Sequence, residues 1–267
     1  THLRSLVNFP SPPGVATHII QLAQDPNIEM GKVAKAIGMD PALATKVLRI
    51  ANSPLYAQRR RSENLRQALI VLGLNATLTL ALSFSLLKSL RGGKPNGVNH
   101  PLYWRRALLG ATSARVLGES SGQTLLEELF LAGLLQDIAM LALDKAVPDL
   151  YRDTAELQKN HRELAAHERK RLGFDHADVG AWLMKQWNLP ERLCSAIAHS
   201  HKLDNRRALD PSDGFNRCVA ISGSMVDIFL QSDERKPFQE TAQQVERVFG
   251  LGKEEFGRSI QRISSLI

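Results

Sequence analysis

The segment from Thr124 to Ala146 constrains the fold most, because it is apolar on nearly every side of a helix. Leucine, isoleucine and phenylalanine recur along it without leaving a polar face. A helix of this kind belongs at the buried centre of a helical domain. Asp137 lies near the middle of this apolar run. A buried carboxylate needs a partner, so we expect a polar or charged contact to Asp137 in the interior.

The composition favours helices elsewhere in the chain of 267 residues. Hydrophobic residues make up 43%, which indicates a globular protein, and aromatic residues make up only 6%. Leucine and alanine dominate the apolar residues, and both are good helix formers. The segment 78–86 is ambiguous, because its large apolar residues alternate with small or polar ones as in a strand. We therefore predict an all-α fold with one segment left open by the local pattern.

Turn-forming residues divide the predicted helices into two lobes. The run 91–97 holds three glycines and a proline and is the strongest linker signal in the chain. We expect an N-terminal helical lobe over 1–92 and a second helical lobe over 93–250. A terminal helix over 251–267 has apolar residues at helical spacing and could continue as a linker into a further domain.

The helix pair predicted over 30–52 has the outline of a DNA-binding helix-turn-helix. Recognition helices present polar or basic side chains to base edges near their N-terminus. Residues 41–44, which occupy those positions here, are all apolar. Two packed helices in a bundle are therefore the favoured interpretation.

The chain is basic, with a formal net charge of +7. Most of the basic residues are scattered, but Arg59, Arg60 and Arg61 are adjacent and Arg66 follows closely. These four are candidate contacts to an anionic partner, although a solvated loop is the commoner explanation of such a run. Nucleic acid is therefore a partner that the sequence allows but does not favour.

The sequence indicates a cytoplasmic protein that does not insert into a membrane. Its two cysteines, Cys194 and Cys218, are isolated from each other, which fits a reducing compartment and excludes a zinc knuckle. The longest apolar stretch, residues 76–87, is too short to span a bilayer. The first ten residues lack the apolar core of a signal peptide.

The stretch Gly133-Leu-Leu-Gln-Asp-Ile138 resembles the Gly-Leu-Leu-His-Asp-Ile-Gly centre of HD-type phosphohydrolases. In those enzymes the His-Asp pair holds a divalent metal that activates water for phosphoester cleavage. Further segments resemble the HDOD family, the HD-related output domains: residues 40–54, 68–73, 104–107, 176–183 and 187–190. The resemblance runs in order over roughly residues 6–249. It implies a two-lobed helical fold, with helix at the ambiguous segment 78–86.

The resemblance also implies where an HD enzyme would carry its metal ligands, and several of those positions have changed. Arg106 stands where a histidine is expected on the helix that contains Trp104, and Gln136 replaces the histidine of the His-Asp pair. Asp137 and His176 match the pattern.

Two further positions complete this comparison. The expected pair of histidines at the next helix end reads Ser200-His201, and the final aspartate falls at Gly223 or its neighbour Ser222. We therefore predict a degenerate site without metal, cofactor or catalytic residues. We expect Arg106 to lie near Asp137 and to replace the charge of a metal, because a guanidinium stays protonated and repels a dication.

The function implied by the resemblance is that of a bacterial signal-transduction module without enzymatic activity. Such a module acts through a protein partner or a covalently attached output domain, and cyclic-dinucleotide signalling is one pathway of this kind. Two alternatives remain open. One is residual metal-dependent phosphohydrolase activity on nucleotides, and the other is nucleic-acid binding through the arginines at 59–61.

Overall fold

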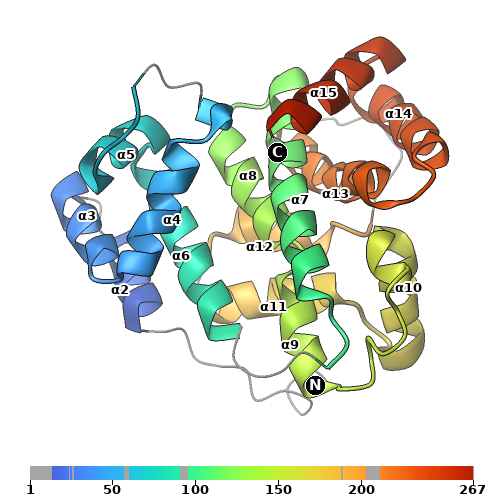
Figure 1. Cartoon of the computed structure of the whole chain (residues 1–267), viewed down its shortest axis with the longest axis horizontal. Coiled ribbons are helices and arrows are strands. Elements are labelled where there is room, and N and C mark those ends of the chain that lie inside the picture. Colours follow the sequence, from blue (N-terminus) through green and yellow to red (C-terminus); the bar gives the residue numbers. More distant parts are fainter. Residues whose placement is uncertain are drawn as a thin grey trace. The chain divides into compact units, whose positions relative to one another are not determined.

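The structure, a computed structural model, describes residues 14–23, 25, 27–56, 60–90, 96–187, 189–202 and 211–266. Every regular element within these ranges is a helix, and none of them is a strand (Figure 1). The predicted all-α fold is confirmed. The segment 78–86 lies in α6 (Leu74–Leu90) and is helical. Residues 80–85 are all buried, so neither a helical nor a strand period separates an inner from an outer face there.

The chain divides into two compact units, Phe9–Gly92 and Gly93–Ser265, apart from its extreme ends. The division falls at the predicted linker, of which residues 91–95 lie outside the described ranges. Within the described residues, no single helix has the length and apolarity needed to cross a membrane. The helix α5 (Leu65–Leu72) and the first part of α6, bent by 119°, meet that test only when taken together.

The N-terminal unit is a small bundle of helices. Asp40 begins α4 by accepting hydrogen bonds from the backbone N–H groups of Ala42 and Leu43, and Asn64 begins α5 in the same way through Gln67. The apolar sides of the helices meet in a core that includes Ile19, Ile37 and Leu69. The elements of this unit besides α5 and α6 are α2 (Gly14–Ala23), α3 (Met30–Gly38), α4 (Pro41–Ala51) and the 3-10 turn η1 (Pro54–Tyr56).

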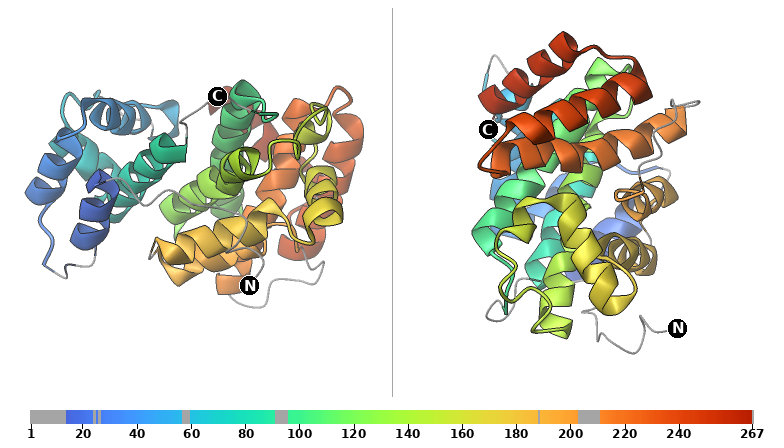
Figure 2. Two further views of the ribbon diagram at one scale, coloured as in Figure 1. Left: turned by 90° about the horizontal axis from the view of Figure 1, so that it is seen from below. Right: turned by 90° about the vertical axis from the view of Figure 1, so that its right-hand side faces the viewer.

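The C-terminal unit holds the larger set of helices, and its core is built around α7 (His100–Ser120) and α8 (Leu126–Leu135). These two helices pack together, and α13 (Pro211–Leu230) packs against both (Figure 2). The remaining elements are α9 (Ile138–Ala146), η2 (Leu157–Lys159), α10 (His161–Leu172), α11 (His176–Gln186), α12 (Glu191–Ala198), α14 (Arg235–Phe249) and α15 (Lys253–Leu266). The terminal helix α15 buries Phe256 and Ile263 within this unit.

One predicted helix differs from the structure. The apolar segment 124–146 is buried, as expected, but it forms α8 and α9 with a break at Gln136 and Asp137 rather than one helix. Asp137 has φ −102° and ψ 10°, which interrupts the helix and leaves its side chain at the N-terminal end of α9. After α9, residues 147–156 form turns and bends before η2 begins.

Candidate functional site

Arg106, on α7, lies at the centre of a buried polar cluster in the C-terminal unit. Its side chain is almost fully buried, with 1% of the residue exposed. Arg106 Nε donates to Asp137 Oδ2 at 3.1 Å, and Nη2 donates to Asp227 Oδ1 at 3.3 Å. The third donor, Nη1, bonds the carbonyl oxygen of Gln158 at 3.2 Å. One guanidinium therefore links two carboxylates from α13 and the α8–α9 junction.

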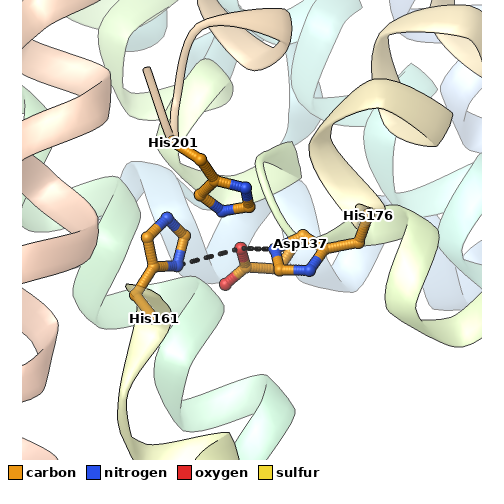
Figure 3. Close-up of side chains that lie close together, drawn as sticks. All are labelled: Asp137, His161, His176 and His201. Carbon is orange, nitrogen blue, oxygen red and sulfur yellow. Dashed lines mark hydrogen bonds and ion pairs between the residues drawn. The ribbon is translucent and has the colours of Figure 1, made fainter. Parts of the chain in front are cut away.

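Three imidazoles surround the other oxygen of Asp137 (Figure 3). His176 Nε2 lies 3.2 Å and His161 Nδ1 lies 3.6 Å from Asp137 Oδ1. The ring of His201 lies against both, with centroid distances of 4.3 Å to His161 and 4.5 Å to His176. One donor atom from each of these four residues can be chosen so that all lie within 4.8 Å of one another. We call this group, Asp137, His161, His176 and His201, the imidazole cluster.

Each member of the imidazole cluster lies at or beside a helix end. His161 and His176 are the first residues of α10 and α11, and His201 follows α12. The start of α11 is fixed by a capping box between Asp175 and Asp178. The start of α10 is capped by Asn160, whose side chain accepts from the backbone N–H of Glu163, and the backbone N–H of His161 donates to the carboxylate of Asp227 at 3.1 Å. Helix ends let four separate segments direct side chains to one point.

Two of the imidazoles are held by carboxylates on the side away from Asp137. His176 Nδ1 lies 2.7 Å from Glu168 Oε2, and the backbone N–H of His176 donates to the same oxygen. Tyr151 donates its hydroxyl proton to Glu168 Oε1 at 2.7 Å. His201 Nδ1 lies 2.7 Å from Asp175 Oδ2, which also pairs with Arg169. These contacts orient both rings so that their Nε2 atoms face away from Glu168 and Asp175, and Nε2 of His176 faces Asp137.

The members of the imidazole cluster differ in their charge at neutral pH. Burial acts to raise the pKa of Asp137, but the surrounding imidazoles and Arg106 outweigh it and hold the pKa well below the usual range. Burial, together with the neighbouring cations, lowers the pKa values of His161 and His201. Asp137 is therefore ionised at neutral pH, while His161 and His201 are neutral and keep lone pairs.

The pKa values of His176 and Asp227 are raised. Burial acts to lower the pKa of His176, but the charge of Glu168 and the hydrogen bonds to Asp137 and Glu168 raise it to about 10. Burial raises the pKa of Asp227 to about 6, against the opposing effect of Arg106. In the metal-free protein, His176 is thus an imidazolium between two carboxylates.

Several nitrogen atoms of the cluster are buried without a hydrogen-bond partner. They are both ring nitrogens of His161 and Nε2 of His201. Buried polar atoms are normally paired, so such a gathering requires an explanation. A bound cation would supply the missing partner, and three imidazoles with one carboxylate are a chemically suitable donor set for a transition metal. The divalent metal of HD-type enzymes therefore finds donors that fit it here.

The structure brings together part of the set of residues predicted from the sequence. Arg106, Asp137, His176 and His201 meet in one place. Ser200 does not take part, since its hydroxyl donates to the carbonyl oxygen of Ile197.

The other two predicted positions lie beside the cluster. The amide of Gln136 packs toward α7, where a Cβ placed on Gly110 would lie 2.5 Å from its Nε2 atom. Gly223 lies against the ring of His161, because a Cβ at this position would be 2.6 Å from His161 Cδ2. The carboxylate expected near Gly223 is supplied one helical turn later by Asp227.

Sequence reasoning missed His161, Asp227 and Glu168. His161 and Glu168 lie in α10, whose many charged residues are typical of a helix at the surface. Asp227 could have been found, because it lies in an apolar run and needs a partner for the same reason as Asp137. The expectation of a metal-free site therefore rested on an incomplete donor set, from which His161 was absent.

The candidate anionic contacts lie in the N-terminal unit. Arg60, Arg61 and Arg66 are exposed there, and Arg59 lies outside the described residues.

In the C-terminal unit, a pocket of about 310 Å³ has Asp227 in its wall and is also lined by Arg162 and Lys236. Asp227 therefore belongs both to the wall of this pocket and to the buried polar cluster around Arg106.

The family model of the HDOD domain matches residues 9–203. A curated relative, an uncharacterized protein from Treponema pallidum, is 25% identical over 199 residues, which are 73% of this chain and 38% of the relative. The chain thus spans less than half the length of that relative.

Two solved structures show the same fold. The MmoQ response regulator from Methylococcus capsulatus is 28% identical with a TM-score of 0.52, covering 92% of this chain and 95% of that one. A protein from Shewanella amazonensis, provisionally named a phosphohydrolase, is 21% identical with a TM-score of 0.73, covering 99% and 94%. With the family model matched over most of its length, this chain belongs to the HDOD family.

Proposed function

We propose that this chain is a non-catalytic, cytoplasmic regulatory module of bacterial signal transduction. It acts through contacts with a protein partner or with an output domain attached to it. Membership of the HDOD family and the likeness to a response regulator support this proposal. The observation that carries it is the position of Arg106 between Asp137 and Asp227.

Catalysis by an HD-type site needs a metal with an open position for water and substrate. Arg106 places a fixed positive charge between Asp137 Oδ2 and Asp227 Oδ1, so these two oxygens are not available to such a metal. A guanidinium remains protonated and offers no lone pair, so it can neither coordinate a metal nor activate a water molecule. The arrangement keeps the charge balance of a metal site and lacks its chemistry.

Burial supports the same conclusion. Arg106, Asp137 and His161 are each 1% exposed. A phosphoester would have to reach these groups in order to be cleaved. The packing of helices over them excludes a substrate of that size in this conformation.

Turnover assays test the proposal. The purified chain is loaded separately with Mn²⁺, Fe²⁺ and Zn²⁺ and supplied with bis(p-nitrophenyl) phosphate, nucleoside monophosphates and cyclic di-GMP. We expect hydrolysis no faster than with the metal ion alone. Metal-dependent turnover that disappears in an Asp137→Asn variant would overturn the proposal.

A residual metal-dependent phosphohydrolase is the second candidate function. It is favoured by the imidazole cluster and by the provisional name of the Shewanella amazonensis neighbour. The Arg106→His variant separates the two candidates, because it returns a metal donor to the position and removes the fixed charge. Turnover in this variant alone would show that Arg106 is what prevents catalysis.

A nucleic-acid-binding regulator is the remaining alternative. The exposed side chains of Arg60, Arg61 and Arg66 are its only support among the described residues. Binding to DNA or RNA through such contacts weakens steeply with salt. A titration at two salt concentrations, with the triple substitution to serine as the comparison, tests it.

A further inference from the structure

We propose that the imidazole cluster binds one divalent transition-metal ion of the zinc class in a closed, non-catalytic site. The ligands are Asp137 Oδ1, one ring nitrogen of His161, and the Nε2 atoms of His176 and His201. His176 releases its Nε2 proton to solvent as the ion binds. This inference is independent of the proposed regulatory function, since binding is measured without reference to turnover.

The donor atoms already converge. One atom from each of the four residues lies within 4.8 Å of the others, and the rings enclose the Asp137 carboxylate from three sides (Figure 3). Zinc–nitrogen and zinc–oxygen bonds are about 2.0–2.2 Å long, so two ligands in a tetrahedral shell lie about 3–4 Å apart. Small rotations of the side chains bring these donors to such distances.

The unpaired nitrogens give an independent reason. Both ring nitrogens of His161 and Nε2 of His201 are buried with no hydrogen-bond partner. Polar atoms in that state destabilise the folded protein unless a partner is supplied. A metal ion among them removes this cost at two of these nitrogens at once, one of His161 and one of His201.

The surroundings match those of a metal site rather than of a simple polar core. Histidine ligands of metals usually donate their second ring N–H to a carboxylate, which fixes tautomer and orientation. His176 has Glu168 in this position and His201 has Asp175, each 2.7 Å away. Two of three imidazoles thus carry the outer carboxylate that a metal ligand needs.

Arg106 does not compete for the same atoms. It bonds Oδ2 of Asp137, while the imidazoles face Oδ1. Asp137 can therefore pair with Arg106 through one oxygen and bind a cation through the other. The outer carboxylates of Glu168 and Asp175 add negative charge on the far side of the ion.

The types of donor atom indicate which metal ion the site binds. Three imidazoles and one carboxylate suit Zn²⁺ and similar transition metals, whereas Mg²⁺ and Ca²⁺ prefer oxygen ligands throughout. Four protein ligands complete a tetrahedral shell and leave no position for a reactive water molecule. The ion would join the α8–α9 junction to the ends of α10, α11 and α12, which makes it a structural or sensory ligand.

Metal binding to the whole chain is tested after dialysis against a chelator. Calorimetric titration with Zn²⁺ should give one equivalent bound, with a rise in melting temperature that grows with metal concentration. Mg²⁺ and Ca²⁺ should give neither. X-ray absorption at the zinc edge should show three imidazoles and one oxygen ligand, a readout that requires no variant.

Two variants and a matched control locate the ion. His201→Asn should abolish stoichiometric binding, while His199→Asn, which changes an exposed histidine two residues away, should leave it intact. Glu168→Gln should weaken binding by about 10–100-fold, the usual effect of losing an outer carboxylate.

Three outcomes would overturn the proposal. They are less than a tenth of an equivalent of Zn²⁺ bound, equal affinity in the His201→Asn and His199→Asn variants, or an absorption spectrum without imidazole ligands. Failure in these measurements would leave the absence of turnover untouched. Conversely, turnover with full binding would overturn the regulatory function and the closed, non-catalytic character of the site, while leaving the metal binding itself intact.

Discussion

Gly133 in α8 lies directly against the backbone of Gly110 in α7. A Cβ placed on Gly133 would be 2.5 Å from the Gly110 carbonyl oxygen and 2.9 Å from Ala111 Cα. Arg106 lies one turn before Gly110, and Asp137 lies one turn after Gly133. The close approach of the two helices therefore sets the distance at which Arg106 meets Asp137.

Gly133→Ala should destabilise the protein despite the better helix propensity of alanine. The new methyl group collides with backbone rather than with a mobile side chain, and overpacking of this kind costs about 1–3 kcal/mol. Gly257→Ala in α15 is the matched control, because no atom lies within 4 Å of its Cβ position. The control should be neutral or stabilising by up to about 1 kcal/mol. Urea unfolding measures both, and equal effects would contradict the close approach.

Arg106→Met should cost about 3–5 kcal/mol, because it leaves Asp227 buried without its cation and leaves Asp137 with His176 alone. The matched control is Arg152→Met, which removes an exposed pair with Asp149. Exposed pairs contribute at most about 1 kcal/mol. The free energies of unfolding in urea distinguish the two substitutions. If Arg106→Met lowered the free energy of unfolding as little as Arg152→Met does, the guanidinium would not balance the charge of these carboxylates.

The pair of His176 and Glu168 should make stability depend on pH in the metal-free protein. Glu168 and Asp137 raise the pKa of His176 to about 10, although burial opposes the shift. The unfolded chain has a histidine pKa of about 6.5. The contribution is complete below that value and declines as the pH rises toward 10. Glu168→Gln should therefore flatten the difference in unfolding free energy between pH 6 and pH 10, and an unchanged slope would refute the pairing.

Both thiols should be unreactive in the native protein. Cys194 and Cys218 are fully buried, and burial raises the pKa of Cys218 to about 12 and that of Cys194 above its usual value. The thiolate is the reactive form, so iodoacetamide at pH 8 should label neither residue. Mass spectrometry should find two labels per chain after denaturation. Rapid labelling without denaturant would show that α12 or α13 opens readily.

The sequence predicts the fold well because the helix signals act locally. Asp40, Asn64 and Asp175 each precede a helix that they begin, as the cap rule requires. The break between α8 and α9 is different. No glycine or proline marks it, and the need to direct Asp137 into the cluster becomes visible only when Arg106 and the imidazoles are in place.

The site could be predicted only in part, for a related reason. Asp137 was identifiable because a carboxylate in an apolar helix needs a partner. His161 gave no such signal, since it begins a helix rich in charged residues and becomes buried through the packing of α13. The glycine at position 223 that makes room for its ring is likewise meaningful only in three dimensions.

The hydrogen bond between Arg106 and Asp227 joins residues 121 positions apart in the chain. Helical proteins usually fold through contacts between near neighbours, but this cluster cannot form until α7 and α13 have met. In a partly folded form in which α13 is not yet packed, Arg106 and Asp137 would lack their contact with Asp227. The C-terminal unit should consequently unfold as a whole rather than helix by helix, and its slowest folding step should be the closure of this long loop.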